Sequence, residues 1–145
     1  MEVQFSFNER SKAAQPISLR QLVTEQASQF QSLALQHRSI LVNDVAADLL
    51  VSTDKNILAS VIASLLRCTV NDSRSSDIRI TAKRYNNIIL LRVRDSNTAF
   101  STAPYQDWKE INRLAGKLGG CIIEDDIRKK HATVTLSFCS MAIAA

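Results

Sequence analysis

Glycine is scarce in this sequence of 145 residues, which contains only Gly116, Gly119 and Gly120. Loops that bind phosphate usually need several closely spaced glycines, because their backbone N–H groups must approach the anion without interference from a Cβ atom. The P-loop and dinucleotide-binding motifs are accordingly absent. A phosphate-binding loop of the usual kind is therefore excluded.

Cysteines and long apolar runs are also in short supply. Cys68, Cys121 and Cys139 are widely spaced and form no CxxC pair, so they favour buried thiols over a disulfide framework or a zinc site. No apolar run approaches the roughly 20 residues that cross a membrane, and the start, MEVQFSFNER, lacks the apolar stretch of a signal peptide. We expect a cytoplasmic protein without a membrane partner.

Histidine is equally rare. His37 lies in LQHRS and His131 in RKKHA, and there is no Gly-x-Ser-x-Gly motif. The sequence therefore gives no support for Ser/His/Asp catalysis. We expect both histidines to lie on the surface.

The apolar pattern predicts alternating helices and strands. Helical spacing predicts helices over 18–37, over 54–71 and after Pro104, the last ended by Gly119 and Gly120. SILVNDV and DLLVST are short β-rich pieces, DIRITAKR and IILLRVRD form a hairpin around residues 85–87, and CIIED and ATVTLSFC form another. This order predicts an α+β two-layer sandwich, in which three helices pack on one face of a mixed, mostly antiparallel sheet. We expect one domain over 16–145, preceded by a strand and linker over 1–15.

The first hairpin has a basic outward face, formed by Arg79, Lys83, Arg92 and Arg94. This face is either an interaction face for an acidic protein or a nucleic-acid backbone, or an ordinary solvated sheet surface. Nucleic acid is the less favoured partner, because the net charge is only +4 and aromatic residues for base stacking are missing apart from Tyr85.

The N-terminal segment VQFSF places Val3, Phe5 and Phe7 on one side of a strand. Such a strand tends to pair with a sheet edge, in this chain or in a second copy. A homodimer formed through this strand is therefore a hypothesis.

Four segments resemble the catalytic and ATP-binding domain of sensor histidine kinases, which belong to the GHKL ATPases. They are PISLRQLV, VSTDKNILASVIASLLRCTV, the hairpin DIRITAKR and IILLRVRD, and INRLAGKLGGCI followed by HATVTLSF. The resemblance covers residues 16–139 and implies a Bergerat-type ATP-binding fold.

The metal motif of that family is altered. The resemblance places the family's Mg²⁺-binding asparagine at Cys68 and an earlier asparagine at Ser64. Magnesium prefers oxygen ligands, which a neutral thiol does not provide. Asn71, one turn further along, is a weak candidate for a shifted ligand, and an asparagine at a fraying helix end is the alternative interpretation.

The nucleotide motifs are altered as well. The family's Asp-x-Gly-x-Gly corresponds to residues 95–99, where Asp95 remains, Asn97 can replace one glycine and the other is lost. Thr133 matches a threonine that the family uses at adenine, so Asp95, Asn97 and Thr133 form a candidate adenine-binding set. Only FSTAPYQDWKE precedes the last helix, so we expect a shortened lid without a phosphate cradle.

These differences lead to two hypotheses. The first is a degenerate domain without phosphotransfer activity, which needs no cofactor and acts as a protein-interaction module in signalling. The second is a divergent but functional ATP-binding domain of a two-component sensor histidine kinase, which would bind ATP and Mg²⁺. Neither histidine lies in the context that the family uses for its phosphoacceptor, so the chain is either a fragment or acts without one. The altered motifs favour the first hypothesis.

Overall fold

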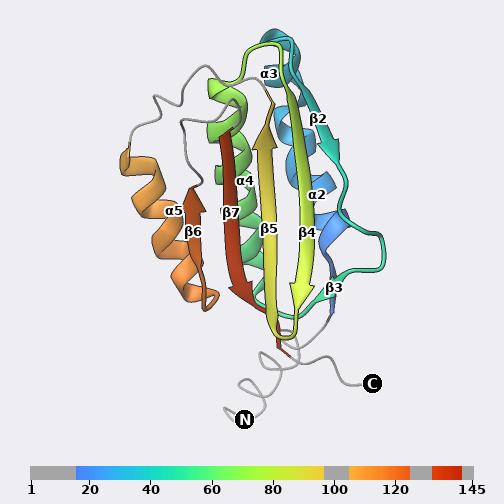
Figure 1. Ribbon diagram of the computed structural model, residues 1–145, viewed down its shortest axis with the longest axis vertical. Helices are drawn as coiled ribbons and strands as arrows, with labels where there is room; N and C mark the ends of the chain where they lie inside the picture. Colours follow the sequence, from blue (N-terminus) through green and yellow to red (C-terminus); the bar gives the residue numbers. More distant parts are fainter. Residues whose placement is uncertain (1–15, 97–104, 125–131, 142–145) are drawn as a thin grey trace, which may run out of the picture.

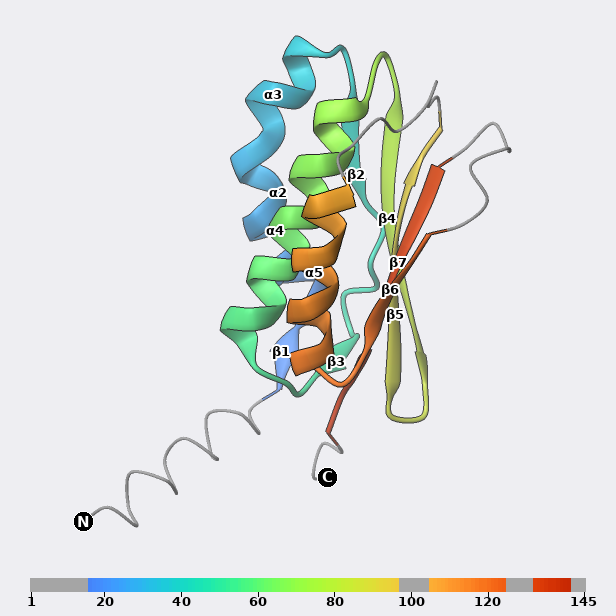
Figure 2. The same cartoon turned by 90° about the vertical axis from the view of Figure 1, so that its left-hand side faces the viewer.

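The computed structural model describes residues 16–96, 105–124 and 132–141, and these residues form two layers (Figures 1 and 2). One layer is a five-stranded sheet with the strand order β2-β4-β5-β7-β6. The other layer consists of helices that all lie on one side of the sheet (Figure 2). The predicted α+β sandwich is therefore confirmed. The expected strand over 3–7 lies outside the described residues.

The described elements are β1 (Ile17–Ser18), α2 (Leu19–Ala27), a 3-10 turn (Ser28–Phe30), α3 (Gln31–Gln36), β2 (Ile40–Asn43), β3 (Leu50–Val51), α4 (Lys55–Asp72), β4 (Asp77–Tyr85), β5 (Ile88–Asp95), α5 (Tyr105–Lys117), β6 (Cys121–Glu124) and β7 (Ala132–Cys139).

The first helical segment begins at a side-chain cap. Ser18 Oγ accepts a hydrogen bond from the backbone N–H of Gln21 at 3.2 Å, which satisfies one of the free donors of the first turn. The segment predicted as one helix changes to a 3-10 turn at Ser28, whose hydroxyl donates to the carbonyl of Glu25 at 2.7 Å. Such serine bonds compete with helical backbone bonds, which explains why α2 and α3 are separate.

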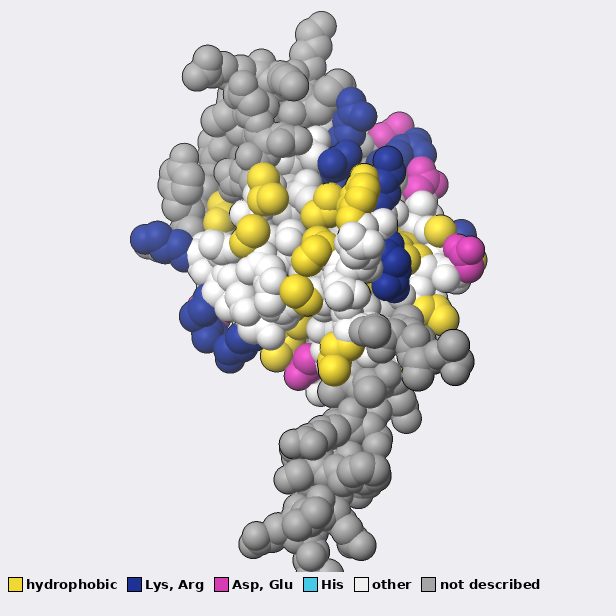
Figure 3. All heavy atoms as spheres, turned by 60° about the horizontal axis from the view of Figure 1, so that its bottom comes forward, with side chains coloured by type: hydrophobic (Ala, Val, Ile, Leu, Met, Phe, Trp, Pro, Cys, Tyr) yellow, Lys and Arg dark blue, Asp and Glu magenta, His cyan; other side chains and the backbone are white. Residues whose placement is uncertain are grey.

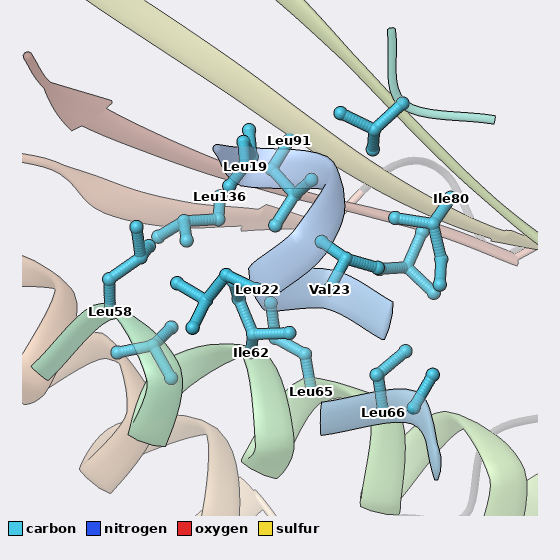
Figure 4. Close-up of a cluster of buried hydrophobic side chains, with 14 of the residues drawn as sticks. Leu19, Leu22, Val23, Leu58, Ile62, Leu65, Leu66, Ile80, Leu91 and Leu136 are labelled. Carbon is cyan, nitrogen blue, oxygen red and sulfur yellow. The ribbon is translucent and has the colours of Figure 1, made fainter. Parts of the chain in front are cut away.

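The central helix α4 begins at Asp54, whose carboxylate accepts from the N–H of Ile57 at 3.1 Å. Its buried side faces the sheet, and α2 and α5 pack beside it (Figure 2). Figure 4 shows where apolar side chains of α2, α4 and the strands meet. The labelled members of this core, all at most 2% exposed, are Leu19, Leu22, Val23, Leu58, Ile62, Leu65, Leu66, Ile80, Leu91 and Leu136. Burial of these side chains is the main force that holds the two layers together.

The sheet is mixed because β2 runs parallel to β4, whereas the other neighbours are antiparallel. The β4–β5 hairpin turns at Asn86 and Asn87, and Asn86 has a φ of 55°. Asparagine tolerates this left-handed conformation better than most residues, which suits it to a two-residue hairpin turn. A second, two-stranded pairing of β1 with β3 was not predicted, because two residues are too few to show a period.

Side chains alternate between the two faces of the hairpin, as predicted. Ile78, Ile80, Ile89, Leu91 and Val93 are buried beneath the helices. The residues between them point to the opposite side, which none of the described helices covers (Figure 2). We call this opposite side the open face. No helix in the described ranges is both long enough and apolar enough to cross a membrane.

Candidate functional site

Asp95 lies at the end of β5, on the face that the helices cover. It stands opposite Ile78 of β4, and residues directly opposite in an antiparallel pair share a face. Asp95 is only 1% exposed. The hairpin is closed at this point by Ser96, whose N–H donates to the carbonyl of Asp77 at 3.1 Å and whose hydroxyl accepts from the N–H of Asp77 at 3.0 Å. The structure therefore fixes a buried carboxylate between the sheet and the helices.

Thr133 does not lie on the same face as Asp95. The register of β5 and β7 places Asp95 opposite Ala132 and Thr133 opposite Arg94. Because neighbouring residues of a strand point to opposite faces, Thr133 belongs to the open face. The structure therefore does not bring the two predicted adenine contacts together, and Asn97, the third, lies outside the described residues. A common role of these residues at adenine stays a prediction.

Cys68, at the expected metal-ligand position, is part of the apolar core. Its side chain is 5% exposed, and the neighbouring Leu65, Leu66 and Val70 of α4 are fully buried. Ser64 is half-buried, whereas Asn71 is exposed near the end of the helix. In the described ranges no group of three or more His, Cys, Asp or Glu side chains is arranged to hold a metal ion. A buried thiol does not suit a hard cation, so Cys68 does not fit Mg²⁺, whereas the role of Asn71 as a shifted ligand stays a prediction.

The connection from β5 to α5 is short. β5 ends at Asp95 and α5 begins at Tyr105, so only residues 96–104 join them, and none of these is a glycine. At about 3.5 Å for each extended residue, such a chain spans roughly 30 Å at most. It is long enough to connect two elements but lacks the glycines with which a phosphate cradle is usually built.

The open face carries the basic cluster that the sequence predicts. Arg79, Lys83, Arg92 and Arg94 are all exposed on it. Arg79 forms an ion pair with Asp44, which follows β2. Asp44 was not among the predicted residues of this face, although an acidic residue just after a strand parallel to β4 is a natural partner for an arginine of β4.

Three hollows lie on the described surface. One of about 240 Å³ is lined by Ser18, Gln21, Glu25 and Lys55, among others, at the beginning of α2 and α4. Another of about 320 Å³ lies between α3 and β2, and one of about 50 Å³ lies on the open face. None of the three is lined by Asp95 or Cys68. The candidate adenine residues and the described hollows therefore do not coincide.

Known structures agree with the predicted fold family. No protein-family model matches the sequence, and no curated protein matches it either. The histidine kinase AdeS of Acinetobacter baumannii is similar, with a TM-score of 0.76 and 12% sequence identity over 88% of this chain and 68% of that one. The catalytic domain of the histidine kinase ThkA, in a nucleotide-free form, has a TM-score of 0.74 and 15% identity over 87% of this chain and 96% of that one. Full-length ShkA in complex with AMPPNP has a TM-score of 0.76 and 14% identity over 90% of this chain and 32% of that one.

These similarities establish the fold. The chain has the α+β architecture of histidine kinase catalytic and ATP-binding domains, which confirms the resemblance at the level of the fold. Because one fold serves many functions, the activity must be argued from the site itself.

Proposed function

We propose that this chain is a histidine-kinase-like ATPase domain that no longer transfers phosphate and acts as a protein-interaction module in signal transduction. The observation that carries the proposal is the burial of Cys68 in the apolar core, at the position where the resemblance expects an oxygen ligand for Mg²⁺. The similarity to histidine kinase domains supports a role in signalling, and the residues at the metal position argue against phosphotransfer.

Phosphoryl transfer depends on a metal ion and positioned donors, because the transferred group carries charge that must be neutralised. In this chain the metal position holds a thiol, and the segment 96–104 has no glycine with which to approach phosphate. Loss of both parts removes the two main sources of charge neutralisation. The fold is then a scaffold whose surface is available to other proteins.

A second candidate is a divergent domain that still binds ATP. The observation that favours it is the buried carboxylate of Asp95, at the position where the resemblance expects contact with the adenine amino group. ShkA, which shares the fold, is known in complex with AMPPNP. Under this candidate Asp95 would accept a hydrogen bond from the base, and the metal would need ligands other than Cys68.

Thermal unfolding with and without ligand separates the two candidates. A ligand at about 100 times its dissociation constant adds roughly 2.7 kcal/mol to the free energy of unfolding. We expect no increase in Tm with millimolar ATP and Mg²⁺. A Tm increase that requires Mg²⁺ would overturn the proposal in favour of the second candidate.

Adenosine serves as the matched ligand control. A Tm increase that is equal for adenosine and ATP and independent of Mg²⁺ would indicate an adenine pocket without phosphate chemistry, which is compatible with the interaction module. The variant Asp95→Asn would then abolish the increase, whereas Asp48→Asn, an exposed carboxylate elsewhere, would leave it unchanged.

A further inference from the structure

The open face has a charge pattern that is unfavourable for folding by itself. Arg79 of β4 stands directly opposite Arg94 of β5, and like charges in this arrangement destabilise a sheet. Arg92, opposite Thr81, has Arg79 and Lys83 as its diagonal neighbours. Four cations therefore lie within two adjacent strands, on the side away from the described helices (Figures 1 and 2).

Only one of these cations has an acidic partner in the described part of the chain. Arg79 pairs with Asp44, and both side chains are nearly half exposed. Within the same residues, no Asp or Glu lies within ion-pair distance of Lys83, Arg92 or Arg94. The face therefore presents uncompensated positive charge to an external anion.

The next strand extends this surface with hydroxyl groups. Thr133 and Ser137 of β7, both half-buried, stand opposite Arg94 and Leu90 of β5, whereas Thr135 between them is buried. Hydroxyls and guanidinium groups together can donate hydrogen bonds to carboxylate oxygens. The open face therefore has charged donors on β4 and β5 and neutral hydroxyl donors on β7.

A small hollow on the open face limits the size of the group that it receives. It has a volume of about 50 Å³ and is lined by Thr81, Lys83, Tyr85, Leu90 and Arg92, together with Ala82. Since one water needs roughly 10–15 Å³ by this measure, the hollow admits a carboxylate or another small side-chain end but no purine ring.

Apolar residues flank the cations at the turn of the hairpin. Tyr85 is 54% exposed and Ile88 is 37% exposed, and they stand opposite each other beside Lys83 and Leu90. Figure 3, which brings this end of the molecule forward, shows basic and hydrophobic side chains close together on the surface. A ligand that spans the open face therefore meets charge over one part and apolar surface over the other.

We infer that the open face docks an extended acidic segment of a partner protein, with carboxylates at Arg92 and Arg94 and apolar side chains at Tyr85 and Ile88. A nucleic acid fits less well, because Tyr85 is the one aromatic residue of this face in the described strands and base-stacking platforms need several. The inference rests on the proposed function only in so far as both assign the domain a protein partner.

Binding of a fluorescein-labelled peptide of alternating glutamate and leucine tests the inference. We expect the double variant Arg92→Glu/Arg94→Glu to weaken binding at least about tenfold, which is roughly 1.4 kcal/mol. The matched control is Arg20→Glu/Lys109→Glu, which makes the same change in net charge with exposed residues of α2 and α5. The control should change the affinity less than about twofold, because charges beyond a Debye length of roughly 8–10 Å are largely screened.

An equal loss of peptide affinity in the two double variants would overturn the inference, since it would show that the peptide responds only to the net charge of the protein. Absence of peptide binding would also overturn it. Tighter binding of a single-stranded oligonucleotide, with the same dependence on Arg92 and Arg94, would replace the acidic protein by nucleic acid.

Two further measurements keep the result interpretable. The variant Arg92→Gln/Arg94→Gln removes charge without reversing it, so it should weaken binding in the same direction even if the reversed variant fails to fold. The ATP and Mg²⁺ unfolding experiment on this neutral variant reports on the proposed function separately. A Mg²⁺-dependent Tm increase in this variant, together with weakened peptide binding, would refute the loss of ATP binding and leave the inferred docking face supported.

Discussion

The imidazole Nδ1 of His37 lies 2.9 Å from the carbonyl oxygen of Val70 and 3.1 Å from that of Ser73. His37 ends the segment that contains α3, and the two carbonyls lie at the end of α4. The last carbonyls of a helix lack intrahelical partners, and a histidine that carries its proton on Nδ1 can donate to them. Arg74 Nη1 lies 3.0 Å from the same Nδ1 and donates to the carbonyls of Asn71 at 3.1 Å and Ser73 at 2.6 Å, so in the other tautomer Nδ1 accepts from Arg74. The sequence suggested that His37 lies free on the surface. In the structure it instead joins two helices.

Replacement of His37 by alanine should lower the free energy of unfolding by about 1 kcal/mol, because a hydrogen bond of this kind contributes roughly 0.5–1.5 kcal/mol. Urea denaturation measures the change. Gln36→Ala, an exposed neighbour, is the control and should be close to neutral. Equal effects of the two substitutions would show that the bonds to α4 contribute nothing.

The substitution Cys68→Asn tests the burial of the metal-ligand position. We expect the free energy of unfolding to fall by about 1–3 kcal/mol, because a buried amide gives up its hydrogen bonds to water and this apolar environment offers few protein partners in exchange. Cys68→Ala removes only the sulfur and should cost less. Denaturation of both variants gives the comparison, and an asparagine variant as stable as the parent protein would contradict the assignment of Cys68 to the core.

Two glycines of neighbouring segments should respond in opposite directions to alanine. A Cβ atom at Gly120 would lie 1.6 Å from the carbonyl oxygen of Ser137, so the backbone must shift. Gly120→Ala should therefore lower the free energy of unfolding by about 1–3 kcal/mol. A Cβ at Gly116, in α5, meets no atom within 4 Å. Gly116→Ala should therefore stabilise the protein by about 0.4–1 kcal/mol, because it restricts the unfolded chain. Thermal unfolding of both variants checks the two signs.

The exposed pair of Glu110 and Arg113 predicts a small dependence of stability on pH. The hydrogen bond from Arg113, with Nη2 2.6 Å from the carboxylate, holds the pKa of Glu110 below its ordinary value. The ionised carboxylate is thus favoured by folding, and this contribution is present above the ordinary glutamate pKa and lost as the pH falls through the lowered one. Urea midpoints of the parent protein and Glu110→Gln should differ slightly at neutral pH and converge in acid. High salt should also reduce the difference, and a gap that widens in acid would contradict this assignment.

The sequence predicted most of the fold because its apolar periods are strong. The alternation of Ile89, Leu91 and Val93 defined both the strand and its buried face. Either Thr53 or Asp54 was expected to cap α4, and the structure has Asp54. The parallel pairing of β2 with β4 was not predictable in the same way, since strand order depends on contacts between distant segments. The break between α2 and α3 also escaped prediction, because it depends on a serine side-chain bond.

The mismatch between Asp95 and Thr133 was partly foreseeable. Asp95 is two residues from the buried Val93 and therefore lies on the same face of β5. Thr133 alternates with the buried apolar residues of β7, such as Leu136 and Phe138, and therefore lies on the other face. A strand's two-residue period therefore already placed the two polar side chains on opposite faces. The family motif suggested a pair, and the local alternation argued against it. The expectation of buried thiols is confirmed for Cys68 but wrong for Cys121 and Cys139, which are exposed.

The described chain enters and leaves the domain at adjoining residues. Ile17 stands opposite Val51, and the N–H of Met141 donates to the carbonyl of Ser52 at 2.8 Å. Close ends of this kind are the condition under which a circular permutant folds, with the old ends linked and new ones opened at a surface turn such as Asn86–Asn87. Because its two ends adjoin, the domain can also be inserted into a surface loop of a host protein without separating the two ends of that loop.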